Sequence, residues 1–307
     1  MSLHIATPLL RSPSLSRAAG RDVWLKIESV QPSGSFKMRG VGHACEARAK
    51  SGATRFMASS GGNAGLAVAH CGRLLGLAVT VVVPTSTGER AKALIAEQGA
   101  EVVVHGASWA EADAHLRGLV VPADAYVHPF DDPLLWTGHA TMIDEIAAAG
   151  VRPDVVVCSV GGGGLMCGVI EGLRRNGWDD VPVVAVETRG ADSLAHALAA
   201  GARIALPAIT SIATSLGARQ VAQQAFDEAR RHEVRNVVVS DARAVDGCLA
   251  IDRAHGLVVE PACGASMAPV LADDAALGDA KTVVVIACGG VSATREQLLA
   301  WKDSLAN

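Results

Sequence analysis

The stretch DVVVCSVGGGGLMCGVIEG, residues 154–172, decides the fold of this chain. A nearly continuous apolar run, 155–160, is followed by four glycines and then by an apolar stretch of helical length. Unbroken β-branched runs of this kind are typical of parallel strands that helices cover on both faces. Seven more such runs alternate with Ala- and Leu-rich stretches along the chain: 23–28, 54–59, 79–84, 101–105, 181–187, 236–240 and 281–290. The alternation predicts an α/β fold built on parallel sheets.

Three glycine clusters stand where predicted strands end. They are SSGGNAG (59–65), GGGG (161–164) and GG (289–290). In open α/β sheets the carboxyl ends of the strands line the ligand crevice, and a helix that begins in a Gly-rich loop presents unpaired N–H groups to anions. The three clusters therefore predict a site for an anionic ligand.

Composition limits the class of protein and of partner. The chain has 307 residues, 50% hydrophobic and 19% charged, so it can bury a large core. Its length favours two domains, and these must be interleaved because no low-complexity linker divides the chain. With 27 basic residues against 31 acidic ones and only 3% aromatic residues, nucleic acid and anionic membranes are disfavoured as partners. A small molecule is the expected partner.

Features of localisation point to the cytoplasm. The uncharged stretch Val155–Ile170 contains four successive glycines and is shorter than the roughly 20 apolar residues of a spanning helix. The first residues, MSLHIATPLLRSPS, lack the basic start and long apolar region of a signal peptide. Seven cysteines without a CxxC pair argue against a disulfide framework or a zinc knuckle. We expect a soluble cytoplasmic protein.

One segment resembles a dinucleotide-binding unit. Between Val155 and Glu187 a strand, a turn with Gly162, Gly164 and Gly168, a helix and a second strand are followed by an acid. The glycine spacing is wider than the dinucleotide fingerprint, which makes the signal weak. A nicotinamide-dependent oxidoreductase stays open as a distant alternative.

The segment PSGSFKMRG, residues 32–40, contains a lysine in unusual company. Phe36 and Met38 flank Lys37 with apolar surface, and Arg39 adds a nearby positive charge. Both features make a lysine lose its proton more easily, as a Schiff-base nucleophile requires. Lys37 is therefore the leading candidate for a catalytic residue.

With this segment the chain resembles the fold-type II pyridoxal-phosphate enzymes, and among them the serine/threonine dehydratase family in its serine dehydratase-like branch. Further matching segments occur in family order over nearly the whole chain: SSGGNAG (59–65), FDDPLLWTGHAT (130–141), SVGGGGLMCGVIEG (159–172), VETRGADS (186–193), LPAITSIATSLGA (206–218), VEPACGA (259–265) and ACGG (287–290). The resemblance implies two parallel-sheet domains in three αβα layers, as in the β subunit of tryptophan synthase. The large domain would comprise residues 1–36 and 137–307, and the small inserted domain residues 37–136.

The resemblance also implies roles in binding pyridoxal 5'-phosphate. Lys37 matches the lysine that holds the cofactor as a Schiff base and then removes the substrate Cα proton. The matching cofactor-binding positions are Phe36 and Ser215 on the two faces of the ring, Asn63 at the 3-hydroxyl, Gly161, Gly162, Gly163, Gly164 and Leu165 at the phosphate, and Cys288, followed by Gly289, at the ring nitrogen. A thiol at that nitrogen does not hold a full proton there, which favours prompt loss of a β-hydroxyl group over transamination.

Two further groups of residues follow from the resemblance. Ser60, Gly61, Asn63 and Ala64 match the loop that binds the substrate carboxylate. A monovalent-cation site, suited to K⁺ because it consists largely of carbonyl oxygens and one carboxylate, would comprise Glu187, Ala191, Ser193, Leu216, Ala218 and Gly161.

The implied activity is a pyridoxal-phosphate-dependent ammonia-lyase. L-serine, and L-threonine as well, would lose water by β-elimination and give pyruvate or 2-oxobutanoate plus ammonia, in a cytoplasmic homodimer. An amino-acid racemase, a β-replacement synthase and a non-catalytic binding protein that retains the fold remain alternatives.

Departures from the family pattern qualify these expectations. Gly61 stands where liver-type enzymes have Ala, so we expect lower activity or a different substrate preference. Val291-Ser292 follows Gly290 in place of an Asn-containing sequence, which affects hydrogen bonding near the ring nitrogen and the phosphate. Because the chain ends at Asn307, we expect no C-terminal regulatory domain and no feedback inhibition by isoleucine.

Overall fold

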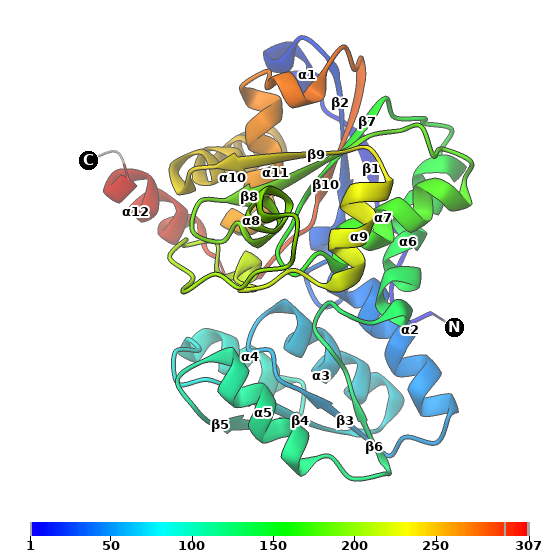
Figure 1. The fold of residues 1–307 in the computed structure, drawn as a ribbon, viewed down its shortest axis with the longest axis vertical. Coiled ribbons are helices and arrows are strands. Elements are labelled where there is room, and N and C mark those ends of the chain that lie inside the picture. The colour runs from blue at the N-terminus through cyan, green and yellow to red at the C-terminus, as the bar shows by residue number, and fades with distance from the viewer. Residues whose placement is uncertain (1, 292, 306–307) are drawn as a thin grey trace.

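A computed structural model describes residues 2–291 and 293–305 (Figure 1). All eight predicted strands are present. They are β2 (Asp22–Ile27), β3 (Arg55–Ala58), β4 (Ala78–Val83), β5 (Glu101–Val104), β7 (Val155–Ser159), β8 (Val183–Thr188), β9 (Val234–Val239) and β10 (Thr282–Ala287). Two strands of three residues each, β1 (Leu9–Arg11) and β6 (Asp124–Tyr126), escaped prediction because they are too short to show a hydrophobic period.

The strands form two separate sheets. The larger has six strands in the order β1-β2-β10-β7-β8-β9, and the smaller has four in the order β5-β4-β3-β6. Every pairing is parallel except that of the short strand β1 with β2, which is antiparallel, so the predicted parallel sheets are confirmed. Strands β7, β8 and β10 are central in the larger sheet and almost wholly buried, as their continuous apolar sequences predict.

Twelve α-helices are present in the described residues. They are α1 (Pro13–Ala19), α2 (Lys37–Lys50), α3 (Asn63–Leu75), α4 (Glu89–Glu97), α5 (Trp109–Leu119), α6 (Pro133–Ala148), α7 (Gly164–Arg175), α8 (Ser193–Ala200), α9 (Gln223–Arg231), α10 (Asp241–His255), α11 (Pro261–Leu271) and α12 (Arg295–Leu305). Three short 3₁₀ helices, η1 (Glu28–Val30), η2 (Thr214–Leu216) and η3 (Ala275–Leu277), lie in the connections. Figure 1 shows the two sheets in two lobes, with α3, α4 and α5 around the smaller one.

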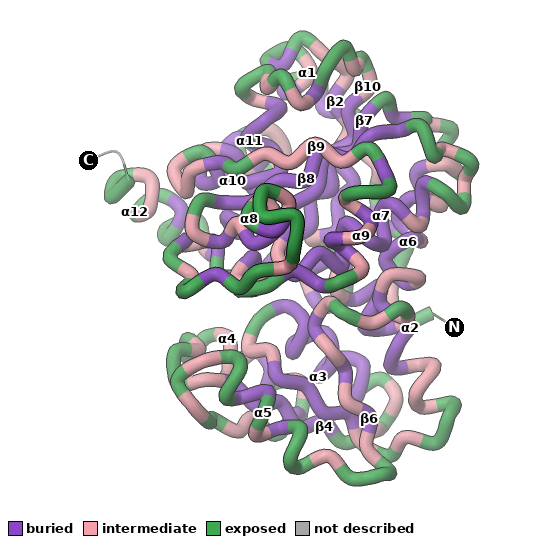
Figure 2. Tube along the Cα trace, viewed as in Figure 1, coloured by how far each residue is buried: buried purple, intermediate pink, exposed green. Residues whose placement is uncertain are grey.

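Each lobe has its own hydrophobic core, which appears as buried chain in the middle of both lobes (Figure 2). Helices α2 and α6 join the lobes, because α2 packs against both α3 and α6, and α6 packs against α7. Along α6 the core changes: Leu135 belongs to the core of the smaller lobe, Trp136 packs on both cores, and Met142 belongs to the core of the larger lobe.

The structure bears on two features of localisation. In residues 2–291 and 293–305, no helix is both long and apolar enough to cross a membrane. All seven cysteines are free and buried.

Candidate active site

Lys37 lies at the junction of two chain segments that are far apart in sequence. It begins α2, directly after a loop that pairs with the end of β10: Phe36 N donates to Cys288 O at 3.0 Å, and Gly290 N donates to Gly34 O at 2.9 Å. These bonds bring the PSGSFKMRG and ACGG segments together, and they place Lys37 at the carboxyl ends of the strands of the larger sheet.

The Lys37 amine is held in a poorly hydrated position. Its Nζ donates to Pro129 O at 2.5 Å and lies 5.0 Å from the centroid of the Phe36 ring. Burial lowers the pKa of Lys37 to about 8, although Cys288 and Glu260 act in the opposite direction. A lysine with this pKa provides far more neutral amine near neutral pH than an exposed lysine does, which suits a nucleophile or a base.

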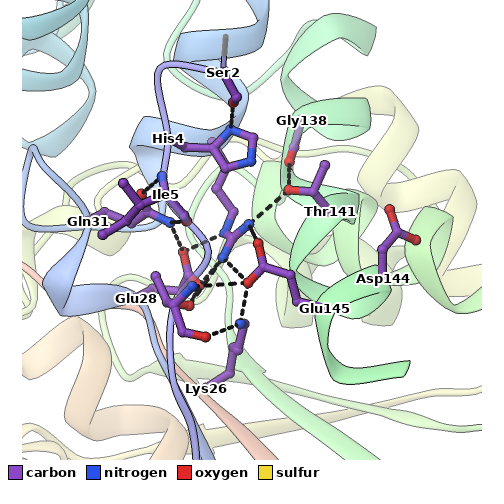
Figure 3. Close-up of polar contacts among 12 residues, drawn as sticks. Ser2, His4, Ile5, Lys26, Glu28, Gln31, Gly138, Thr141, Asp144 and Glu145 are labelled. Atoms are coloured by element: carbon purple, nitrogen blue, oxygen red, sulfur yellow. Dashed lines mark hydrogen bonds and ion pairs between the residues drawn. The ribbon is translucent and has the colours of Figure 1, made fainter. Parts of the chain in front are cut away.

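A buried ion cluster anchors the first turn of α2 to the larger lobe (Figure 3). The guanidinium of Arg39 donates to both carboxylate oxygens of Glu28, at 2.7 and 2.8 Å, and to both of Glu145, at 2.7 and 2.8 Å. Lys26 also pairs with Glu145, and its ammonium donates to Thr7 O at 2.7 Å. Arg39 and Glu28 are fully buried, so two cations and two anions neutralise one another inside the protein.

The four glycines after β7 form a loop that leaves no room for side chains. A Cβ on Gly162 would lie 2.2 Å from the Phe130 ring, and one on Gly163 would lie 2.2 Å from Ala225. Gly163 also has φ of 91°, a conformation that favours glycine. No side chain caps α7 within the described residues, so the first N–H groups of this helix remain available to an anion.

A second helix N-terminus faces the same region from the smaller lobe. Helix α3 begins at Asn63 without a side-chain cap among the described residues, after the loop that contains Ser60 and Gly61. Asn63 Nδ2 donates to Glu260 Oε1 at 2.7 Å, a contact that joins α3 to the start of α11 in the larger lobe. The side chain of Thr87 occupies the space beside Gly61, with its Cγ2 atom 2.6 Å from where a Cβ would lie.

Comparison with known proteins identifies the family. The family profile described as "Pyridoxal-phosphate dependent enzyme" matches residues 1–289. The chain belongs to this family of enzymes. It is 42% identical over 315 residues to a mouse protein named L-serine dehydratase/L-threonine deaminase, covering 99% of this chain and 96% of the other. It is 44% identical over 313 residues to the mouse serine dehydratase-like protein, with coverage of 98% and 95%.

A solved structure agrees in fold and in sequence. The L-serine ammonia-lyase of the fungus Rhizomucor miehei superposes with a TM-score of 0.93 at 36% identity, over 99% of each chain. The fold-type II architecture expected from the sequence is thereby confirmed.

The residues present fit the pyridoxal phosphate of this family. The glycine loop and the uncapped start of α7 form a cradle for a phosphate group, and Lys37 provides an amine for an aldehyde. Cys288 Sγ lies 3.6 Å from Ser159 Oγ, and a hydrogen bond with Cys263, together with burial, raises the pKa of Cys288 well above its usual range. Cys288 is therefore a neutral thiol, as expected for a partner of an unprotonated ring nitrogen.

The two predicted faces of the ring differ in their surroundings. Phe36 is partly buried and packs on His139, with ring centroids 4.9 Å apart. Ser215 is exposed in η2, next to Leu216, whose Cα would lie 2.9 Å from a Cβ on Gly161.

The dinucleotide-like segment serves other purposes in the structure. Gly168 lies inside α7, where a Cβ would stand 2.3 Å from the Cβ of His139, so this glycine permits α6 and α7 to pack closely. The carboxylate of Glu187 is buried and accepts hydrogen bonds from Leu194 N, Ala195 N and Asn236, so it does not face a ribose. The nicotinamide alternative is wrong for this chain, given the family to which it belongs.

The predicted cation-site residues lie in two groups. Glu187, Ala191 and Ser193 lie at the end of β8 and the start of α8, while Gly161, Leu216 and Ala218 meet where η2 approaches the glycine loop. Burial raises the pKa of Glu187 to about 7, and Ser193 Oγ is buried without a partner among the described residues. The described residues contain no cluster of three His, Cys, Asp or Glu side chains, so carbonyl oxygens would have to supply most ligands.

Several residues at the site were not singled out from the sequence. Glu260 and Phe130 lie within quoted segments but had no assigned role, and Thr87, His128 and Pro129 lie outside those segments. Their roles depend on contacts between distant segments, for which the sequence contains no local signal. Of the two departures after Gly290, Val291 packs its side chain on Gly34 and accepts a hydrogen bond from Arg90 at 3.3 Å, whereas Ser292 lies outside the described residues.

Proposed function

We propose that this protein is a pyridoxal-phosphate-dependent L-serine ammonia-lyase that also accepts L-threonine. The observation that supports this most is the Lys37 amine, which is lowered in pKa and donates to Pro129 O, next to the Phe130 ring that packs on the glycine loop. Near full-length similarity to proteins named L-serine dehydratase and L-serine ammonia-lyase points to the same reaction. The products would be pyruvate or 2-oxobutanoate and ammonia.

The proposed roles divide the site into a cofactor half and a substrate half. Pyridoxal phosphate, when bound, supplies a covalent site for the substrate amine and withdraws electrons from its Cα. Lys37 would hold the cofactor through its amine, and the contacts to the cofactor ring would come from Phe36, Ser215, Asn63 and Cys288. The N–H groups of Gly161 to Gly164 and Leu165, together with Gly289 near the ring, complete the binding set.

The substrate half lies at the start of α3. Ser60, Gly61, Asn63 and Ala64 orient the substrate by its carboxylate, because a helix N-terminus offers N–H donors and a partial positive charge. The Lys37 amine would remove the Cα proton, and the hydroxyl group on Cβ would take up a proton and leave as water. Closure of the smaller lobe toward the larger one would exclude water from this step.

The assay that tests this function measures keto-acid formation from L-serine without any added nucleophile. Pyruvate and ammonia in equal amounts are expected. Formation of D-serine without pyruvate would instead identify a racemase, and a requirement for an added nucleophile would identify a β-replacement synthase.

We expect Gly61→Ala to impair substrate binding. The added methyl group would lie 2.6 Å from Thr87 Cγ2 and 2.7 Å from its Oγ1, so the carboxylate loop must shift. The KM for L-serine should rise about 10-fold, because even a small displacement of a loop that positions the substrate weakens binding. The double variant Gly61→Ala/Thr87→Ala removes both clashing atoms and should recover most of the loss. An unchanged KM in the single variant would show that the loop containing Gly61 does not position the bound substrate.

We further propose a K⁺ site that includes Glu187, Ala191, Ser193, Leu216, Ala218 and Gly161. The buried carboxylate of Glu187 supports it, as does the buried hydroxyl of Ser193, which has no hydrogen-bond partner in the part of the chain that the structure describes. Replacing tetramethylammonium chloride by KCl should raise the midpoint of thermal unfolding by roughly 3 °C. In Glu187→Gln, which keeps the shape and loses the charge, this increment should disappear. An equal increment in both proteins would place the cation elsewhere.

The proposal extends to the organisation of the protein. Residues 1–36 and 137–307 would form the large domain and residues 37–136 the small one, a division consistent with the change of core along α6. A cytoplasmic location fits seven free cysteines, because unpaired thiols are common in reducing compartments. The assembly is proposed to be a homodimer.

A further inference from the structure

The turn after β6, residues 128–131, contacts both Lys37 and the glycine loop. Pro129 O accepts the hydrogen bond from Lys37 Nζ, and the Phe130 ring lies where a Cβ on Gly162 would stand. The turn itself is held by His128, whose Nδ1 accepts from Phe130 N at 3.2 Å and from Asp131 N at 2.7 Å.

One of these hydrogen bonds is made by the same peptide group that accepts the hydrogen bond from the Lys37 amine. The carbonyl of Pro129 and the N–H of Phe130 belong to one planar trans peptide unit, so they point in opposite directions and rotate together. His128 binds the N–H end of this unit and Lys37 binds the carbonyl end. Any change at the His128 ring nitrogen is therefore transmitted to the acceptor of the Lys37 amine.

We propose that His128 is a positioning residue for Lys37: its ring holds the Pro129–Phe130 peptide unit so that the carbonyl faces the Lys37 amine. The inference rests on the role of Lys37 in the proposed function. Once the freed amine has taken a proton, its ammonium finds an acceptor already aligned, and the lysine stays in register with the cofactor and substrate positions.

The surroundings of His128 keep the ring uncharged, as the proposal requires. Aromatic rings enclose it: Phe130 at 4.6 Å, Tyr126 at 6.0 Å and Trp109 at 6.2 Å between centroids, each with its ring steeply inclined. Burial lowers the pKa of His128 to about 4. The charges of Asp131 and Asp113 act against burial, and those of Arg117 and Lys37 act with it. At neutral pH, Nδ1 therefore remains an acceptor for both N–H groups.

The other groups around Lys37 do not replace the carbonyl. Glu260 favours the ammonium by its charge, whereas Cys288 is a neutral thiol at neutral pH. His139, which is fully buried, is also uncharged, because burial lowers its pKa well below the usual range. The Pro129 carbonyl is thus the direct partner of the ammonium.

Two matched variants separate hydrogen bonding from packing. His128→Asn keeps an acceptor near the position of Nδ1, in the manner of an Asx turn, but removes the ring. His128→Phe keeps an aromatic ring for Trp109, Tyr126 and Phe130 but removes the acceptor. Both are compared with the wild type as full chains, and His128→Gln, whose acceptor is one methylene further out, substitutes for His128→Phe if that variant does not fold.

The first readout is the pH dependence of Lys37 acetylation in the cofactor-free chain, followed by mass spectrometry of the Lys37 peptide. In His128→Phe the midpoint should fall by about one pH unit, the size expected for loss of a hydrogen bond to a charged group. In His128→Asn it should stay close to that of the wild type. The second readout is turnover of L-serine by the holoenzyme, where kcat should fall about 10-fold in His128→Phe with little change in KM.

The outcomes are distinguishable. An unchanged midpoint in His128→Phe, or a shift of equal size in His128→Asn, would overturn the role of His128. If the wild-type chain forms no keto acid, the proposed function fails, while the acetylation midpoints still decide whether His128 controls the Lys37 amine.

Discussion

Replacing Lys37 by Ala is expected to abolish both cofactor retention and turnover. The variant loses the only amine placed against the Pro129 carbonyl among the described residues, and with it both the covalent attachment and the proposed base. Turnover of L-serine should fall by at least about 10³-fold, since general base catalysis alone contributes about 10²–10⁴-fold. The measurements are pyruvate formation and the absorbance near ~410 nm of the desalted protein, where cofactor bound to a lysine absorbs.

Lys50→Ala is the matched control, because Lys50 is the exposed last residue of the same helix. It should leave both the absorbance and the turnover unchanged. Turnover that survives in Lys37→Ala would refute the assignment on which the proposed function depends.

The second large effect is expected on stability, in Arg39→Met. This variant leaves the fully buried carboxylate of Glu28 without its ion-pair partner and removes two of the hydrogen bonds to Glu145. Breaking a buried ion pair in this way costs about 3–5 kcal/mol of the free energy of unfolding, which urea denaturation measures. Because the cluster anchors the first turn of α2, weaker cofactor binding should accompany the loss.

Two comparisons test the cause of this effect. Arg11→Ala removes an exposed ion pair with Asp22 and should cost less than about 1 kcal/mol. Glu28→Gln/Arg39→Met removes both charges of the Arg39–Glu28 pair and should recover a large part of the loss, since an uncompensated charge is the main penalty. A loss in Arg39→Met as small as that in Arg11→Ala would show that the cluster contributes little to stability.

The same cluster predicts how stability depends on pH. Burial alone would raise the pKa of Glu145, but hydrogen bonds from Arg39 and Lys26 outweigh it and lower the pKa below 4.5. Glu145 therefore contributes stability that is fully present above its unfolded pKa and is lost as the pH falls through its folded pKa. In Arg39→Met the folded pKa rises, so acid unfolding should begin at a higher pH than in the wild type.

Much of the fold was predictable because its signals are local. The runs that became β7 and β10 are almost entirely apolar, and each is followed by glycines that the structure requires at the ends of those strands. The short strands β1 and β6 were not predictable, since three residues show no periodicity and their pairing depends on β2 and β3 elsewhere in the chain.

The candidate site also contains residues that were predictable from the sequence and contacts that were not. Lys37 and the four glycines stand out in the sequence because a nucleophile and bare backbone amides need particular residue types in adjacent positions, whereas Asn63 was identified through the resemblance to the family. The Asn63–Glu260 contact joins residues 197 positions apart, so it could not be predicted from neighbouring residues.

By itself, then, the sequence determined the α/β class, the family and the segments that carry the chemistry, because hydrophobic period, glycine clusters and a flanked lysine are properties of neighbouring residues. Only the tertiary structure decided what surrounds those segments. Three features arise where separate elements converge at strand ends. They are the buried ion cluster around Arg39, the contact of Thr87 with Gly61, and the peptide unit held between His128 and Lys37. These contacts depend on residues that are distant in the sequence and become neighbours only when the two lobes bury their hydrophobic cores. A pattern among adjacent residues cannot predict them.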